Sequence, residues 1–159
     1  MNWNKTGFFL LGLLWGAALM FFGIVLYLRA SLLDERVSEI PFDDVVQKLT
    51  ETTKKFPDWT VQNVPCVLPV SKDGTRMQAF RLCHQHYAAD MTESESDRKI
   101  SCMLPCVFSV YEKVDGKTYL SRVNVSLLGR ILGGAPGHVF PEKVAPEQEA
   151  ILHYLGFTR

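Results

Sequence analysis

A long apolar segment near the N-terminus constrains this chain more than any other feature. No charged residue occurs from Thr6 to Leu28. As a helix, this segment would span ~34 Å, which is enough to cross the ~30 Å hydrocarbon core of a bilayer. Trp3 and Tyr27 lie near its two ends, where amphipathic aromatic side chains anchor at the headgroups. The pattern predicts one membrane-spanning helix and divides the chain into an anchor, residues 1–31, and a domain, residues 32–159.

A cleavable signal peptide is the alternative interpretation of this segment. Its apolar region would be ~7–15 residues long and would end in a small-x-small cleavage site. Here the apolar segment is longer and is followed by Tyr27, Leu28 and Arg29, so we expect an uncleaved anchor. The Lys and Arg residues on its two flanks favour neither orientation clearly. Because a short tail precedes the helix and a large domain follows it, we expect a single-pass protein of the bacterial inner membrane with a periplasmic C-terminal domain.

Two glycines in the apolar segment are spaced for close helix packing. Gly12 and Gly16 form a G-x-x-x-G motif, at which another membrane helix can approach closely. Glycine is also common in membrane spans, so the short motif has an equally good non-specific explanation. The partners that it predicts are other membrane-protein subunits, or a second copy of the chain in a homodimer, with the lipid bilayer around the rest of the helix.

The clearest pattern in the domain after the anchor begins at Val107. A β-branched and aromatic run to Val114 is followed by Asp115-Gly116, which suits a tight hairpin turn, and then by a second alternating run. Together with the remaining apolar patterns, this hairpin predicts an α+β fold, a compact, β-α-β-rich antiparallel sheet with helices on one face. Further strands are expected at 32–40, 59–64 and 77–84, helices from Pro41, at 87–91, 126–131 and 146–155, and a mobile surface loop at Gly133–Gly137.

The charge balance and the motifs exclude several classes of function. Seventeen Lys and Arg residues balance 17 Asp and Glu residues, and no basic stripe is visible, so nucleic acid is not an expected partner. No glycine loop of the Walker or dinucleotide-binding type occurs. A Ser-His-acid triad cannot be recognised from spacing, because its geometry is spatial. Enzymatic activity is left open and without support.

Several segments resemble a known family. They are Phe80–Cys83, Tyr87–Ala89, Met103–Glu112 and Asp115–Lys117, and they are similar to the bacterial family called "domain of unknown function 302" over roughly residues 34 to 155. The resemblance implies a compact α+β fold that often pairs into dimers. Because no activity is established for that family, it implies no catalytic residue. The anchor and the cysteines set this chain apart from the family's soluble members.

The four cysteines are candidates for two disulfides, which are common in exported domains. Three pairings are open. If the chain from Cys102 to Cys106 were extended, their Cα atoms would lie ~13 Å apart, too far for a direct bridge, although a loop there could bring them together. The disulfide candidates are Cys66, Cys83, Cys102 and Cys106.

A metal site is the second interpretation of the same residues. Thiolate and imidazole ligands suit copper or zinc, and the candidate ligands are Cys83, His86, Cys102 and Cys106. The closer Cys-x-x-Cys pairs of structural zinc sites are absent from the sequence. We therefore favour structural cysteines, with no cofactor.

Together these patterns predict a membrane-anchored accessory or interaction subunit without catalysis of its own. The expected setting is a bacterial membrane redox or respiratory complex, because of the anchor and the cysteines. The alternative is a thiol- or metal-handling periplasmic redox protein that binds copper or zinc.

Overall fold

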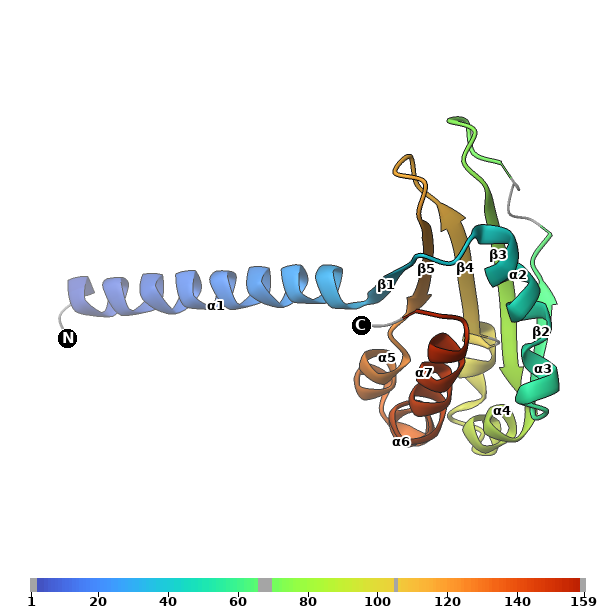
Figure 1. Cartoon of the computed structure of the whole chain (residues 1–159). Coiled ribbons are helices and arrows are strands. Elements are labelled where there is room, and N and C mark those ends of the chain that lie inside the picture. Colours follow the sequence, from blue (N-terminus) through green and yellow to red (C-terminus); the bar gives the residue numbers. More distant parts are fainter. Residues whose placement is uncertain (1–2, 66–69, 105, 158–159) are drawn as a thin grey trace. The chain divides into compact units, whose positions relative to one another are not determined.

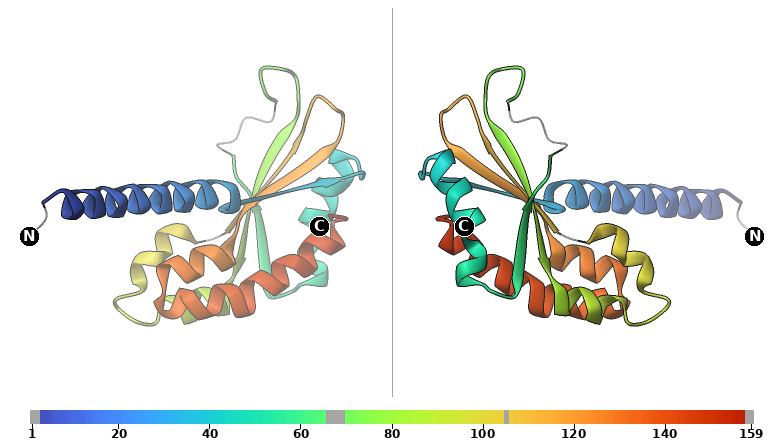
Figure 2. Two further views of the ribbon diagram at one scale, coloured as in Figure 1. Left: turned by 90° about the vertical axis from the view of Figure 1, so that its left-hand side faces the viewer. Right: turned by 90° about the vertical axis from the view of Figure 1, so that its right-hand side faces the viewer.

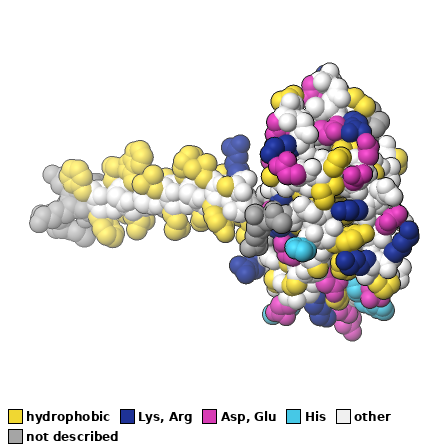
Figure 3. All heavy atoms as spheres, viewed as in Figure 1, with side chains coloured by type: hydrophobic (Ala, Val, Ile, Leu, Met, Phe, Trp, Pro, Cys, Tyr) yellow, Lys and Arg dark blue, Asp and Glu magenta, His cyan; other side chains and the backbone are white. Residues whose placement is uncertain are grey.

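The computed structural model describes residues 3–65, 70–104 and 106–157 (Figure 1). The chain forms two units, Met1–Leu32 and Leu33–Arg159. The first unit is a single helix, α1 (Trp3–Ser31), and its segment Gly7–Ser31 is long and apolar enough to span a membrane. Large apolar side chains are exposed along this helix (Figure 3). This agrees with the apolar helix expected from the sequence.

The second unit is built on a five-stranded antiparallel sheet in the order β1-β5-β4-β3-β2. The central β4–β5 hairpin pairs Val110 with Leu120, and its turn contains Gly116 at φ 76°, the left-handed conformation that glycine adopts without strain. All five strands lie where the sequence predicts them. Their bounds are β1 (Leu33–Ser38), β2 (Trp59–Asn63), β3 (Met77–His84), β4 (Cys106–Glu112) and β5 (Thr118–Val123).

Alternation along the strands produces one buried face. Phe80, Leu82, Phe108, Val110 and Leu120 are at most 1% exposed and point into the core, as the two-residue period of a strand requires. Figure 2 shows two helices, α2 (Phe42–Thr50) and α7 (Ala145–Tyr154), on the same side of the sheet. The α+β prediction is confirmed.

The remaining helices connect the strands or precede α7. The prediction of a mobile surface loop at Gly133–Gly137 is wrong, because most of this segment forms α6. This helix continues directly through a π-helical turn into α7. Gly129 explains this packing: a Cβ atom there would lie 2.6 Å from the carbonyl oxygen of Pro136, so only glycine lets α5 approach α6 so closely. These helices are α3 (Thr52–Lys55), α4 (Gln85–Thr92), η1 (Arg98–Met103), α5 (Val125–Leu132), α6 (Gly134–Val139) and η2 (Phe140–Val144).

The start of α5 also differs from the expectation. The helix begins at Val125, and Asn124 caps it by accepting a hydrogen bond of 3.1 Å from the backbone N–H of Leu127. Ser126, the first residue of the helix expected at 126–131, lies within the first turn. Asparagine is among the strongest N-cap residues, so the cap that was overlooked is two residues earlier.

Candidate functional site

A polar pocket lies at the β1–β5 edge of the sheet. Its volume is about 830 Å³, within the range of small-molecule sites. Its walls come from β1, the end of β5, the first turn of α5 and the η2–α7 segment. The charged and hydroxyl-bearing residues that line it include Asp34, Arg36, Arg122, Ser126, Arg130 and Glu149.

Two buried guanidinium groups form the floor of this pocket. Arg36 and Arg122 stand on the inward faces of β1 and β5, and both side chains are only 7% exposed. Arg36 donates hydrogen bonds of 2.8 and 2.7 Å to the two carboxylate oxygens of Glu149 and one of 2.9 Å to Asp34. Arg122 donates to Asp34 through Nη2 at 3.0 Å and also contacts Glu149. Two cations and two carboxylates therefore hold one another.

The electrostatics of this cluster follow from its pairing. Burial alone would raise the pKa of Asp34, but hydrogen bonds from Arg36 and Arg122 outweigh it and hold that pKa below its ordinary value. For Glu149 the same balance applies, and its pKa is also lowered. Buried charge is costly unless it is paired. The cluster therefore stays fully ionised at neutral pH.

Gln148 connects this cluster to the interior of the sheet. Its side chain is fully buried, and its Oε1 atom accepts a hydrogen bond of 3.0 Å from Nη1 of Arg122. Its Nε2 atom has no hydrogen bond of normal geometry to the described residues, and the amide interacts weakly with the thiol of Cys106. Gln148 thus links Arg122, in the pocket, to the half-buried thiol of Cys106.

The second cluster surrounds Cys106 in the interior. Cys83 and Cys106 line a small cavity of about 20 Å³ together with His84. Burial raises the pKa of Cys106 to about 11 and also raises that of Cys83. The thiolate is the form that acts as a nucleophile or metal ligand. Because both pKa values are raised, both side chains are neutral thiols at neutral pH.

An acidic residue organises the aromatic side of the same cavity. Glu147 accepts hydrogen bonds of 2.6 Å from Nε1 of Trp59 and from the hydroxyl of Tyr87. The hydrogen bond between Tyr87 and Glu147 is the main reason that the pKa of Tyr87 is raised to about 12. The ring of His84 stacks on that of Tyr87 with centroids 3.7 Å apart, which fixes the end of β3 against α4.

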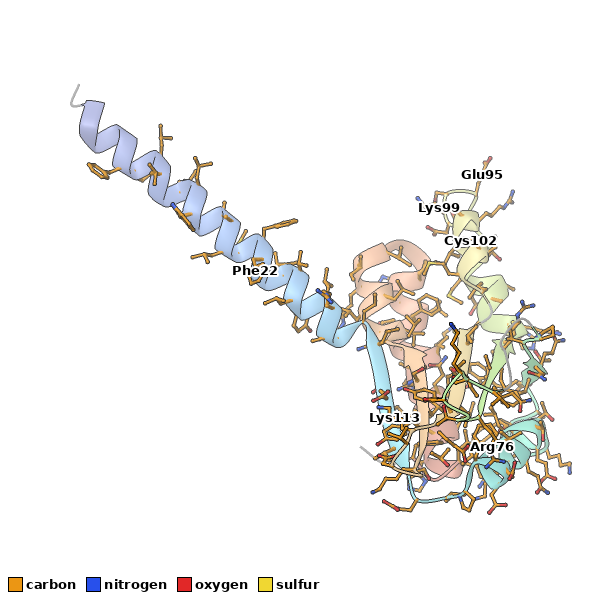
Figure 4. The ribbon with its side chains drawn as sticks, turned by 90° about the horizontal axis from the view of Figure 1, so that it is seen from above. Phe22, Arg76, Glu95, Lys99, Cys102 and Lys113 are labelled. Atoms are coloured by element: carbon orange, nitrogen blue, oxygen red, sulfur yellow. The ribbon has the colours of Figure 1, made fainter. Side chains whose placement is uncertain are left out.

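The four residues of the predicted metal site are not gathered. Cys83 and Cys106 line one cavity and Cys102 and Cys106 line another, whereas His86 lines neither, and His86 and Cys102 are both exposed. Figure 4 shows Cys102 on η1 beside Lys99, away from Lys113 at the far end of the domain. Within residues 7–65, 70–104 and 106–157, no three His, Cys, Asp or Glu side chains are arranged to hold a metal ion.

Three of the four cysteines predicted to form disulfides lie in the described part of the chain. Cys83, Cys102 and Cys106 carry free thiols, so none of these three is bridged to another. Cys66 lies outside the described residues. Whether the purified protein contains a bridge stays a prediction for measurement.

The comparisons with known proteins agree with this fold. The family described as "Domain of unknown function DUF302" matches residues 34–152. The chain belongs to this family. The crystal structure of an uncharacterized conserved DUF302 protein from Bacillus stearothermophilus is similar to this chain with a TM-score of 0.63 and 16% identity, over 78% of this chain and 98% of that one. No curated protein matches the sequence.

Three consecutive residues of α7 organise both clusters of this DUF302 domain, and the sequence analysis overlooked them. Glu147 binds Trp59 and Tyr87, Gln148 binds Arg122, and Glu149 binds both buried arginines. One signal was available: Arg122 follows Leu120 by two residues in an alternating segment, which places a cation on the inward face of the strand. A cation at such a position needs an acidic partner.

Proposed function

We propose that this protein is a membrane-anchored accessory subunit whose domain binds a partner or ligand and does not transform it. The observation that carries the proposal is the direction of the pKa shifts. The pKa values of Asp34 and Glu149 are lowered, whereas those of Cys83, Cys106 and Tyr87 are raised. Each of these pKa values is shifted further from pH 7, whereas general acid–base catalysis works best with a pKa near the operating pH. These groups suit fixed positioning.

The anchor supplies the second part of the proposal. Leu13, Phe21 and Phe22 are each about 60% exposed or more, and lipid or another apolar helix must cover such side chains. Gly12 and Gly16 lie four residues apart on one face of this helix, and a second helix can approach such a pair of small residues closely. We place the protein in the bacterial inner membrane with a periplasmic domain. Its redox or respiratory setting stays a prediction.

Co-purification of the full chain tests this proposal. A tagged protein is extracted from bacterial membranes in mild detergent, and the proteins that accompany it in fixed stoichiometry are identified. Gly12→Leu combined with Gly16→Leu should abolish that association. Gly7→Leu is the matched control, because Gly7 lies 140–180° around the helix from the motif at 100° per residue, and it should leave the association intact.

Two results would contradict the accessory role through this helix. One is unchanged association in the double variant, and the other is equal loss in the Gly7→Leu control. A reporter fused after Arg159 tests orientation separately. Reporter activity typical of the periplasm is expected, and cytoplasmic activity would overturn the proposed topology.

The thiol- or metal-handling alternative gains less support from the geometry. Its candidate ligands are split between a half-buried pair, Cys83 and Cys106, and two exposed residues, His86 and Cys102. Metal analysis of the purified full chain, combined with mass spectrometry of the unreduced protein, distinguishes the two functions. Stoichiometric copper or zinc would favour the alternative, and a metal-free protein would favour the accessory subunit.

A further inference from the structure

We infer that the pocket at the β1–β5 edge binds an amphiphilic oxyanion, a molecule with a carboxylate or phosphate group on a small apolar body. The inference goes beyond the accessory role and does not depend on it. It rests on the way in which the charges of the pocket are distributed. The α5 wall carries the guanidinium of Arg130 and the backbone N–H groups of the first helical turn. The acidic side chains of the pocket already form ion pairs with other residues.

The acids that line the pocket are each paired with a cation. Asp34 and Glu149 are held by the two buried guanidinium groups. Glu35 is bound 2.8 Å from Nζ of Lys113 and also accepts a hydrogen bond from Tyr111. A cationic ligand would therefore have to break an existing ion pair in order to find an acidic partner, which disfavours that class.

Arg130 is the cation that remains. It lines the pocket and is exposed, and no ion pair to it occurs within the part of the chain that the structure describes. It follows Ser126 by four residues, so the two share one face of α5. A guanidinium and a hydroxyl on the same face suit a carboxylate or phosphate group, which accepts both hydrogen bonds.

The first turn of α5 adds donors to the same wall. The first N–H groups of a helix find no acceptor within the helix. The Asn124 side chain accepts the hydrogen bond of the Leu127 N–H at 3.1 Å. Among the described residues, the N–H groups of Val125 and Ser126 have no hydrogen-bond acceptor. Both residues line the pocket. The positive end of the helix dipole favours a negative group at this position.

The remaining wall is apolar, which sets the second half of the ligand. Pro141, Ala145 and Pro146 line the pocket beside the charged floor. A volume of about 830 Å³ holds more than an inorganic ion. A compact organic anion, with its acid group at Arg130 and its apolar body against the proline residues, uses both walls.

Binding of three matched probes to the full chain tests this inference. The protein is placed in nanodiscs of zwitterionic lipid, and benzoate, phenyl phosphate and benzyl alcohol are titrated by ligand-observed NMR. At least one of the two anions should bind saturably, and the neutral alcohol should bind at least about tenfold more weakly. Arg130→Ala should weaken anion binding about tenfold, since a charge-assisted hydrogen bond is lost. Arg130→Lys should restore part of it.

Arg81→Ala is the matched control, because Arg81 is also an exposed arginine of the domain but lies outside the pocket. It should bind the anions as the unaltered protein does. Nanodiscs of anionic lipid distinguish the source of the ligand: if they block benzoate, a lipid headgroup occupies the pocket, and if they do not, the ligand is soluble. No saturable anion binding, equal binding of the alcohol, or equal weakening by Arg81→Ala would overturn the inference. None of these readouts involves a partner subunit, so this inference and the accessory role fail separately.

Discussion

The β1–β5 edge and the centre of the sheet bury their side chains in opposite ways. At the centre, Phe80 and Phe108 are at most 1% exposed and pack among apolar neighbours. At the edge, Arg36 and Arg122 occupy equivalent inward positions, and carboxylates satisfy them. An apolar inward face is stabilised when other side chains pack tightly against it and leave no voids. A charged face can border a hollow, because its hydrogen bonds, and not its contact area, hold it together.

The comparison implies that the two regions fail differently when one side chain is removed. Phe80→Ala should produce the largest loss, about 4 kcal/mol of unfolding free energy, because it removes a buried ring and leaves a cavity in the centre. Urea denaturation followed by circular dichroism measures it. A loss below about 1 kcal/mol would mean that the centre collapses around the substitution and is less tightly packed than its burial indicates.

Arg122→Met should cost about 3 kcal/mol, since it removes the donor to Gln148 and leaves Asp34 and Glu149 with Arg36 as their remaining buried guanidinium partner. The same denaturation assay applies. Arg81→Ala, at an exposed position, should change stability by no more than about 0.5 kcal/mol. If Arg122→Met proved neutral, the cluster would not stabilise the edge, and the contrast with the apolar centre would disappear.

Glu147→Gln should have a smaller effect, about 1 kcal/mol, because the amide oxygen can still accept one of the two hydrogen bonds from Trp59 and Tyr87. The pKa of Tyr87, now raised to about 12 mainly by the hydrogen bond to Glu147, should fall towards its ordinary value. NMR titration of the ring resonances detects this fall. An unaltered titration would show that other groups set the pKa.

Acid should weaken the edge gradually, and this is the smallest effect near neutrality. The folded-state pKa values of Asp34 and Glu149 lie below their ordinary values, so the unfolded chain binds more protons as the pH falls. Their contribution is complete above the unfolded pKa values of about 4 and is lost as the pH falls through the folded values. Urea midpoints measured from pH 6 to about pH 3 should decline less steeply for Glu149→Gln; parallel curves would contradict this linkage.

The sequence by itself determined the strands of the sheet and the apolar N-terminal helix. Runs such as Val107–Val114 and the uncharged Thr6–Leu28 segment carry their own periodicity and composition, and both are local properties. Its main failure, at Gly133–Gly137, arose because local glycine content favours a loop. The contact of α6 with Gly129 comes from the packing of the two helices and cannot be read from composition.

Only the tertiary structure decided which polar residues form a site. Asp34, Arg122 and Glu149 are distant in the sequence, and their ion pairs depend on strand order and on the angle at which α7 crosses the sheet. The sequence could place Arg122 on an inward face, because alternation is a local rule. It could not supply the partner, because a buried charge is satisfied by whichever carboxylate the fold brings within hydrogen-bond distance. For the same reason Cys83, His86, Cys102 and Cys106, which the sequence offered as one metal site, form no such cluster in the described part of the chain, although Cys83 and Cys106 are neighbours.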